Sequence, residues 1–135
     1  MQMTQTKLER KSKKIVVSIS YQDVAADGLT KQLTVHSWGN GEIVTAAWMA
    51  VKTAWDGGDT VTASVGITGD LVAILTAQDA KSTGIKSSKG DKAKGSYLVF
   101  ADGTALIIEF TSTVSKLDQA TQGSLELHLI VENTV

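Results

Sequence analysis

Apolar and polar residues alternate one by one through much of this chain, and this period of two constrains the fold more than any other feature. Near the start, Ile15, Val17 and Ile19 alternate with Val16, Ser18 and Ser20. Near the end every second residue is apolar, at Leu125, Leu127, Leu129 and Val131. A period of two places neighbouring side chains on opposite faces of a β-strand. We therefore expect strands that bury one face.

Further β-rich segments lie between these two, at residues 29–36, 42–54, 60–65, 97–100 and 106–110. Residues 71–80 fit either a short helix or a strand with a loop, and residues 81–94 fit a surface loop or a frayed edge strand. No recurring helix of about 10–15 residues separates the strands, which argues against a parallel α/β sheet. We expect an all-β fold, an antiparallel β-sandwich of about eight strands and of jelly-roll type.

Residues 42–54 are apolar on both faces, as is typical of a central strand that is covered on both sides. Their small residues would also tolerate a helix, but β-branched content and flanking glycines favour a strand. Trp48 lies in this segment, so we expect it in the core. Trp38 and Trp55 flank turns, so we expect them to be partly exposed. Exposed tryptophans can stack on a sugar, but two of them make a weak case for a carbohydrate site, and we expect no carbohydrate binding.

The strongest local turn signal lies between residues 97–100 and 106–110. An Asp-Gly pair, Asp102 and Gly103, separates these two β-rich segments. Asp-Gly is favoured in the tight turns that join antiparallel strands. We therefore expect the two segments to pair as a hairpin.

A chain of 135 residues has room for one domain, and the distribution of charge divides it further. Residues 1–14 have no apolar run and hold one acidic residue, Glu9, against five basic ones: Lys7, Arg10, Lys11, Lys13 and Lys14. The remainder is acidic, since the whole chain has a net charge of -1. We therefore expect a basic N-terminal arm over residues 1–14 and the β-sandwich domain over residues 15–135.

The five basic residues of the arm are the candidate partner-binding residues. A solvated tail and an arm that orders against a partner are both consistent with them. The arm lacks interleaved aromatic residues, which disfavours nucleic acid as the partner. The chain has no apolar run of about 18 residues, so we expect no membrane-spanning helix.

The residues that carry chemistry are few. Without cysteine the chain has no thiolate nucleophile or ligand, and the two histidines, His36 and His128, fit outward or interface positions in strands better than a zinc site. Asp56 and Asp59 fit either a calcium site or an aspartate that caps turn amides. No Gly-x-Ser-x-Gly motif occurs, and the separation of carboxylates in space cannot be read from the sequence. We expect no enzyme, no catalytic residues, no metal site and no cofactor.

The order of several segments resembles small β-sandwich virion proteins of tailed bacteriophages. The resemblance spans about residues 15–132 and rests on many weak positions, which are residues 15–21, 27–33, 41–44, 51–58, 63–70, 94–98 and 121–131. Within it, the turn from Val65 to Asp70 has the spacing Val-Gly-x-x-Gly-Asp. Proteins of this kind decorate capsids or form head fibres, commonly as trimers.

The resemblance implies a non-enzymatic virion structural protein that decorates or stabilises the capsid as an oligomer. The expected partners are other virion proteins such as the major capsid protein, and further copies of the chain in a trimer. The expected location is the capsid surface, after synthesis in the host cytoplasm. The alternatives are a tail or adaptor component of the virion and a carbohydrate-binding β-sandwich module.

Overall fold

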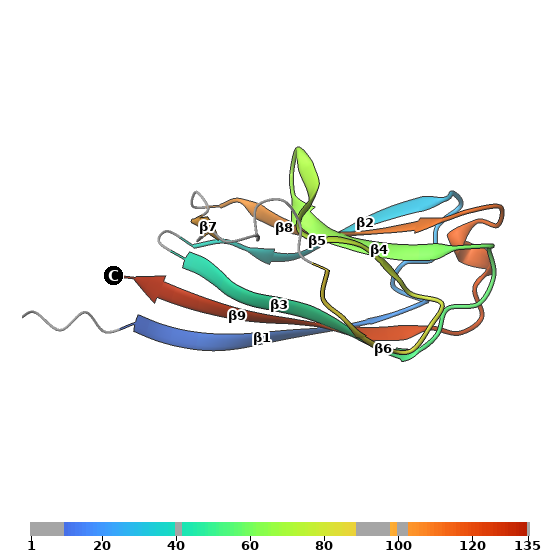
Figure 1. Ribbon diagram of the computed structural model, residues 1–135. Helices are drawn as coiled ribbons and strands as arrows, with labels where there is room; N and C mark the ends of the chain where they lie inside the picture. The colour runs from blue at the N-terminus through green and yellow to red at the C-terminus, as the bar shows by residue number, and fades with distance from the viewer. Residues whose placement is uncertain (1–9, 40–41, 89–97, 100–102, 135) are drawn as a thin grey trace, which may run out of the picture.

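The fold is an antiparallel β-sandwich, as the alternation predicts. A computed structural model describes residues 10–39, 42–88, 98–99 and 103–134. Two sheets lie face to face, and the described ends of the chain emerge at the same end of the sandwich (Figure 1). Nearly all of the regular structure is strand, with one 3-10 turn, η1 (Leu117–Gln119).

The first sheet has the order β1-β9-β3-β6, with β7 also paired to β3. Its strands are β1 (Arg10–Ser20), β9 (Ser124–Thr134), β3 (Glu42–Thr53), β6 (Gly84–Lys86) and β7 (Leu98–Val99). The short strands β6 and β7 pair with opposite ends of β3, so they share one edge position.

The second sheet has the order β2-β8-β4-β5. Its strands are β2 (Thr30–Ser37), β8 (Ala105–Ser112), β4 (Val61–Ile67) and β5 (Asp70–Asp79). Within the two sheets, β1 pairs with β9, β2 with β8, β3 with β6 and β7, and β4 with β5. This nested pairing is the jelly-roll arrangement that the sequence predicts.

The core lies between the two sheets and follows the period of two. In β9, Leu125, Leu127 and Leu129 are buried, while Glu126 and His128 alternate with them on the outer face. Burial of each such side chain contributes about 1.5–3 kcal/mol. Strand β3 is covered on its inner face by the core and flanked on both edges, by β9 and by β6 with β7, which confirms the expected central strand. Its outer face, which was expected to be covered, instead carries the half-buried Trp48.

The first strand begins earlier than expected. β1 starts at Arg10, five residues before Ile15, and every residue from Arg10 to Ser20 pairs with a residue of β9. Backbone hydrogen bonds to the long partner strand extend β1 through polar residues that carry no hydrophobic alternation. The basic residues from Arg10 to Lys14 therefore lie in the sheet, and residues 1–9 of the expected arm are outside the described residues.

The expected hairpin between residues 97–100 and 106–110 is wrong. β7 pairs with β3 in the first sheet, whereas β8 pairs with β2 and β4 in the second. Gly103 has a positive φ of 82°, as a turn glycine often does, but the turn carries the chain from one sheet to the other. The Asp-Gly signal locates the turn, while the partner of each strand is set by distant residues.

The expected exposure of Trp38 and Trp55 is also wrong, since both side chains are fully buried. The centre of the Trp55 ring lies 5.2 Å from that of the Phe110 ring, and Gly123 also lies against the Trp55 ring. A Cβ added at Gly123 would come within 2.4 Å of the Trp55 ring, so this glycine allows the turn to cover the tryptophan.

Two ambiguous segments become strands. Residues 71–80 form most of β5, with Ala73, Ile74 and Leu75 fully buried. Within residues 81–94, Gly84–Lys86 form the short edge strand β6, and residues 89–94 lie outside the described residues.

Candidate interaction surface

The two sheets present very different outer surfaces. We call the outer surface of the first sheet the aromatic face, because its middle row across β1, β9 and β3 is Val16, His128 and Trp48. We call the outer surface of the second sheet the threonine face. Its outward residues across β2, β8 and β4 are mostly small or polar, namely Thr30, Gln32, Thr34, Thr62, Ser64, Ile107, Glu109 and Thr111.

A stacked pair of rings occupies the centre of the aromatic face. The rings of Trp48 and His128 lie 5.1 Å apart with an angle of 7° between their planes. The ammonium group of Lys14 lies 5.6 Å from the centre of the Trp48 ring, a cation–π distance. The rows on either side add the apolar residues Ala50 and Ile130, and the same two rows also hold the charged residues Glu126 and Lys14.

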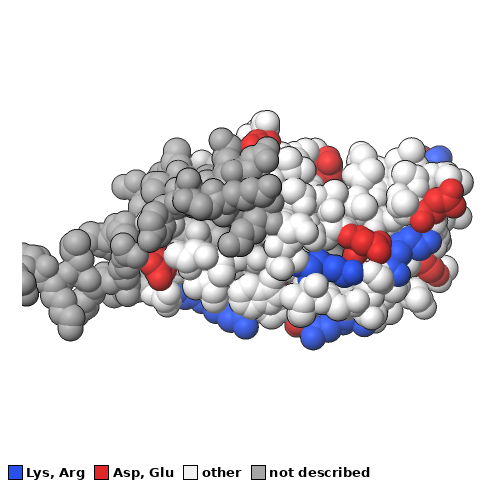
Figure 2. Space-filling model, in the orientation of Figure 1, with Lys and Arg blue, Asp and Glu red and all other residues white. Residues whose placement is uncertain are grey.

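Charged groups of both signs flank these rings. The Glu126 carboxylate lies 3.4 Å from Nε2 of His128 and 3.6 Å from the ammonium group of Lys52. Figure 2, in which the first sheet lies below the second, shows that basic and acidic residues are also interspersed over the described part of that side of the sandwich. Such a mixed pattern suits a protein surface better than the long single-sign stripe of a nucleic-acid site.

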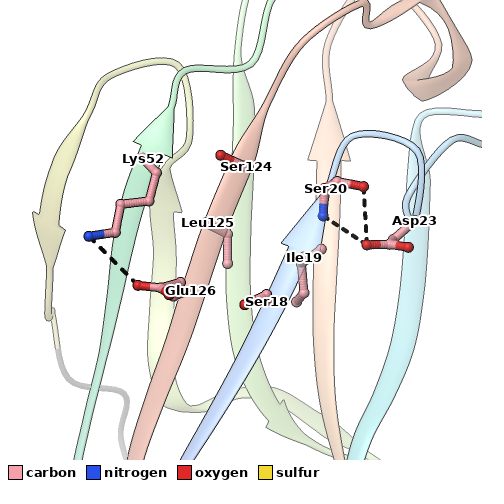
Figure 3. A pocket seen from close by; sticks show the side chains of 8 residues that line it. All are labelled: Ser18, Ile19, Ser20, Asp23, Lys52, Ser124, Leu125 and Glu126. Atoms are coloured by element: carbon pink, nitrogen blue, oxygen red, sulfur yellow. Dashed lines mark hydrogen bonds and ion pairs between the residues drawn. The ribbon is translucent and has the colours of Figure 1, made fainter.

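An open hollow of about 420 Å³ lies at one end of this face, where β1 and β3 end and β9 begins. Figure 3 shows its lining, with Lys52 paired to Glu126 on one side and Asp23 accepting hydrogen bonds from the amide and hydroxyl of Ser20 on the other. Ser18 and Ser124 add further hydroxyl groups. Lys52, Glu126 and Asp23 already have partners within the chain, so we treat the hollow as part of the aromatic face.

A second hollow, of about 590 Å³, lies over the threonine face. It is lined by residues 68–72 of the β4–β5 hairpin and by Gln32 and Ile107. The tip of this hairpin stands away from the second sheet in Figure 1. At its base, a Cβ added to Gly66 would come within 2.2 Å of the Asp70 carbonyl oxygen, so glycine is required for the close approach of β4 and β5.

The five predicted arm residues do not form one site in the described structure. Lys7 is outside the described residues, and Arg10 and Lys11 are described only as backbone within β1. Lys13 and Lys14 diverge because neighbours on a strand face opposite ways. Lys13 pairs with Glu42 at 3.3 Å, while Lys14 reaches Trp48.

Glu42 is a buried carboxylate at the start of β3, with 4% of its surface exposed. It accepts a hydrogen bond from the Gly39 amide, and it lies near the Lys13 ammonium group and 3.7 Å from Nε2 of His36. Burial by itself raises the pKa of Glu42, but the Gly39 hydrogen bond, together with Lys13 and His36, holds it below the ordinary value of 4.5. This cluster ties β1 and β2 to β3.

The metal-site alternatives receive no geometric support. Asp56 accepts hydrogen bonds from the hydroxyl and amide of Thr121 and the amide of Gln122, and these bonds hold its pKa below the ordinary value. It acts as an amide cap for the β8–β9 connection. No group of three or more potential metal ligands occurs among the described residues, and in that part of the chain no helix is long and apolar enough to cross a membrane.

Sequence reasoning missed the aromatic face. Trp48 is half-buried on the outer surface rather than in the core, and His128 stacks on it from the neighbouring strand. The outward residues of β9 could have indicated this surface, because Glu126, His128 and Ile130 are larger than the serines and threonines found at many outward positions of this chain. Pairing these positions with Trp48 required the register of β3 against β9.

Comparisons with known proteins support the fold. No protein-family model and no curated protein matches the chain by sequence. A solved structure described as "Cyanophage Pam1 capsid asymmetric unit" is similar over 100% of this chain and 93% of its own, with a TM-score of 0.64 and 14% identity. Another, from "Bacillus endospore appendages form a novel family of disulfide-linked pili", covers 100% and 96%, with a TM-score of 0.40 and 12% identity. The first shows a shared fold, and the second is too distant to carry an argument.

Proposed function

We propose that this chain is a non-enzymatic structural protein of a bacteriophage virion, which decorates or stabilises the capsid as an oligomer. The observation that carries the proposal is the similarity of the whole chain to a chain of a cyanophage capsid, at a TM-score of 0.64. The sequence resemblance to phage virion proteins points in the same direction. A jelly roll of this kind suits the role because its nested long-range pairing resists local opening.

The aromatic face supports an assembly role. Its centre combines half-buried Trp48 with Val16, which is 45% exposed, and charges of both signs surround them. Interfaces between proteins commonly have an aromatic and apolar centre with a polar rim. The proposal includes a trimer as the basic oligomer, with the major capsid protein as its partner on the particle.

Analysis of purified virions tests the proposal. Particles from the phage that encodes this chain are separated into heads and tails, and the chain is quantified by mass spectrometry relative to the major capsid protein. We expect it in the head fraction at a fixed ratio. Its enrichment in the tail fraction would support the tail or adaptor alternative, and its absence from both fractions, despite expression in infected cells, would overturn a virion role.

A further inference from the structure

The aromatic face is the outward surface on which the described structure gathers an aromatic pair, exposed aliphatic side chains and charges of both signs. Five rows cross it, and their β9 residues are Ser124, Glu126, His128, Ile130 and Glu132. At the β6 edge, Ile85 lies opposite Ala50 and is 67% exposed. Burial of such a face would need a partner with a matching arrangement of charges.

We propose that a second copy of this chain packs on the aromatic face. The two copies are related by a two-fold axis that lies between their aromatic faces, perpendicular to the strands and level with His128. The inference rests on the proposed function, because that function includes self-association, and it adds which surface the copies share and how they are related. Two sheets packed in this way lie about 10 Å apart, with their strands nearly aligned.

The pattern of charge along β9 selects this axis. A two-fold axis perpendicular to the strands at His128 sets the row of Glu126 against the row of Ile130 in the second copy. Lys14 lies in the row of Ile130, on the neighbouring strand β1. The same axis sets each strand against its own copy, so Glu126 lies directly opposite Ile130 of the other copy and one strand spacing, about 4.8 Å, to the side of its Lys14. A lysine side chain is long enough to span that offset, and this diagonal contact of opposite charges occurs twice.

The same operation makes the remaining rows compatible. Lys52 lies in the register shift between Val51 and Thr53 at the end of β3, so the operation brings it near the row of Glu132, diagonally across from that carboxylate. Val16, His128 and Trp48 lie on the axis and face their own copies, which buries the apolar centre against itself. An axis parallel to the strands that runs along β9 would instead set Glu126 against Glu126, so the charges disfavour it.

The size of the face predicts a weak contact. Four strands at about 4.8 Å spacing and five rows along β9 give a face of about 500 Å². The total area buried on the two copies, about 1,000 Å², lies near the lower end of the range for specific interfaces, where transient contacts are found. The contact doubles the number of chains in the basic oligomer, from one to two for a monomer or from three to six for a trimer.

Charge-reversal variants test the symmetry through the mass of the oligomer. Wild type, K14E, E126K and the double variant are compared by light scattering between about 1 µM and 1 mM, the range in which weak interfaces associate. We expect the wild-type mass to double with concentration. Each single variant sets like charges against each other at both contacts, so its association should weaken at least ~10-fold.

A mixture of the two single variants gives the sharpest outcome. In a K14E–E126K pair both contacts join opposite charges again, so the mixture and the double variant should both regain association. E109K, on the threonine face, is the matched control and should associate like wild type. If the wild-type mass never doubles, or if the mixture associates no better than K14E alone, the proposed contact is overturned.

A cross-linking measurement gives an independent readout that does not depend on charge. The chain has no cysteine, so Val16→Cys introduces a single thiol on the axis, facing its own copy at about 10 Å. A short bis-maleimide reagent should join two V16C chains and leave T111C chains, on the threonine face, as monomers. Equal cross-linking of the two variants would overturn the contact, whereas a failure of the virion assay alone would leave this result unaffected.

Discussion

The two outer faces of this sandwich cover the same core but are made of different residues. On the threonine face, Thr34 and Gln32 are exposed, and the Gln32 amide donates a hydrogen bond of 3.0 Å to the Glu109 carboxylate. On the aromatic face, Trp48 and His128 stack at the centre. The first pattern satisfies polar groups with water and neighbours, whereas the second leaves apolar area at the surface.

The difference shows that strands with the same buried inner face can carry either polar or aromatic residues on their outer face. Alternation fixes which residues face inward, but it leaves the outward residues free to serve another purpose. On β8 that freedom supplies Glu109 and Thr111, and on β9 it supplies Glu126, His128 and Ile130. The outward row therefore carries the information about contacts that the inward row lacks.

The largest expected effect concerns the inner faces, where the two sheets should behave alike. Leu127 in the first sheet and Ile108 in the second are both fully buried. Because each alanine substitution removes packed side-chain volume, Leu127→Ala and Ile108→Ala should each lower the free energy of unfolding by about 2–5 kcal/mol. Chemical denaturation measures both. A cost below about 1 kcal/mol for either residue would show that its sheet does not share the core as described.

The next effect should separate the outer faces. Trp48→Ala removes the ring that stacks on His128 and contacts Lys14, so we expect a loss of about 1–2 kcal/mol of unfolding free energy. Thr111→Ala on the threonine face should cost less than about 0.5 kcal/mol. Equal costs in the same denaturation assay would remove the distinction between the two faces.

A smaller effect depends on pH and concerns Glu42, which joins β3 to β1 and β2. Its pKa in the folded protein lies below the ordinary 4.5, so its ionised form stabilises the fold. This contribution is complete above pH 4.5 and is lost as the pH falls through the folded-state pKa. Thermal unfolding of wild type and Glu42→Gln should therefore differ by about 4 °C near neutral pH and converge in acid. A constant difference across the pH range would contradict the ion pairing of Glu42.

The smallest expected effect concerns Lys14 within a single chain. Its contact with the Trp48 ring is a cation–π interaction at a partly exposed site, so Lys14→Gln should cost about 0.5–1 kcal/mol. Lys116→Gln, which removes only an exposed ion pair with Asp27, is the control and should cost less than about 0.5 kcal/mol. If both substitutions lower the free energy of unfolding equally, the contact between Lys14 and the Trp48 ring does not stabilise the fold.

The sequence predicted the class of fold because alternation is a local signal. The alternation from Leu125 to Val131 predicts which side chains are buried without information from any other segment. The structure buries the apolar ones, Leu125, Leu127, Leu129 and Val131, as expected. The absence of helical periodicity between such segments was enough to favour two antiparallel sheets. The jelly-roll type followed from strand number and spacing.

Strand partners could not be predicted in the same way. Leu98 and Val99 lie a few residues from β8, yet they pair with Ile43 and Val44. Likewise, residues 10–14 have no apolar alternation, and they form strand because β9 offers backbone partners. Both outcomes depend on residues far away in the sequence, which a local pattern does not report.

The candidate surface was predictable only in part. The basic residues of the N-terminal segment were recognised as a group, but strand alternation sends Lys13 and Lys14 in different directions. The sequence predicts partial exposure for Trp38 and Trp55 because both flank turns, but both are buried, and Trp55 packs against Phe110 and Gly123. The Trp48–His128 pair required the register of two strands about 80 residues apart.

An electron cryomicroscopy reconstruction of the virion tests the central claim most directly, namely that this sandwich is a virion component whose aromatic face makes contacts. We predict density for the jelly roll on the capsid shell, with Trp48 and His128 buried against a second copy and Thr34 and Gln32 facing solvent. A shell without this density, or a sandwich bound there with its aromatic face open to solvent and its threonine face buried, would contradict the account.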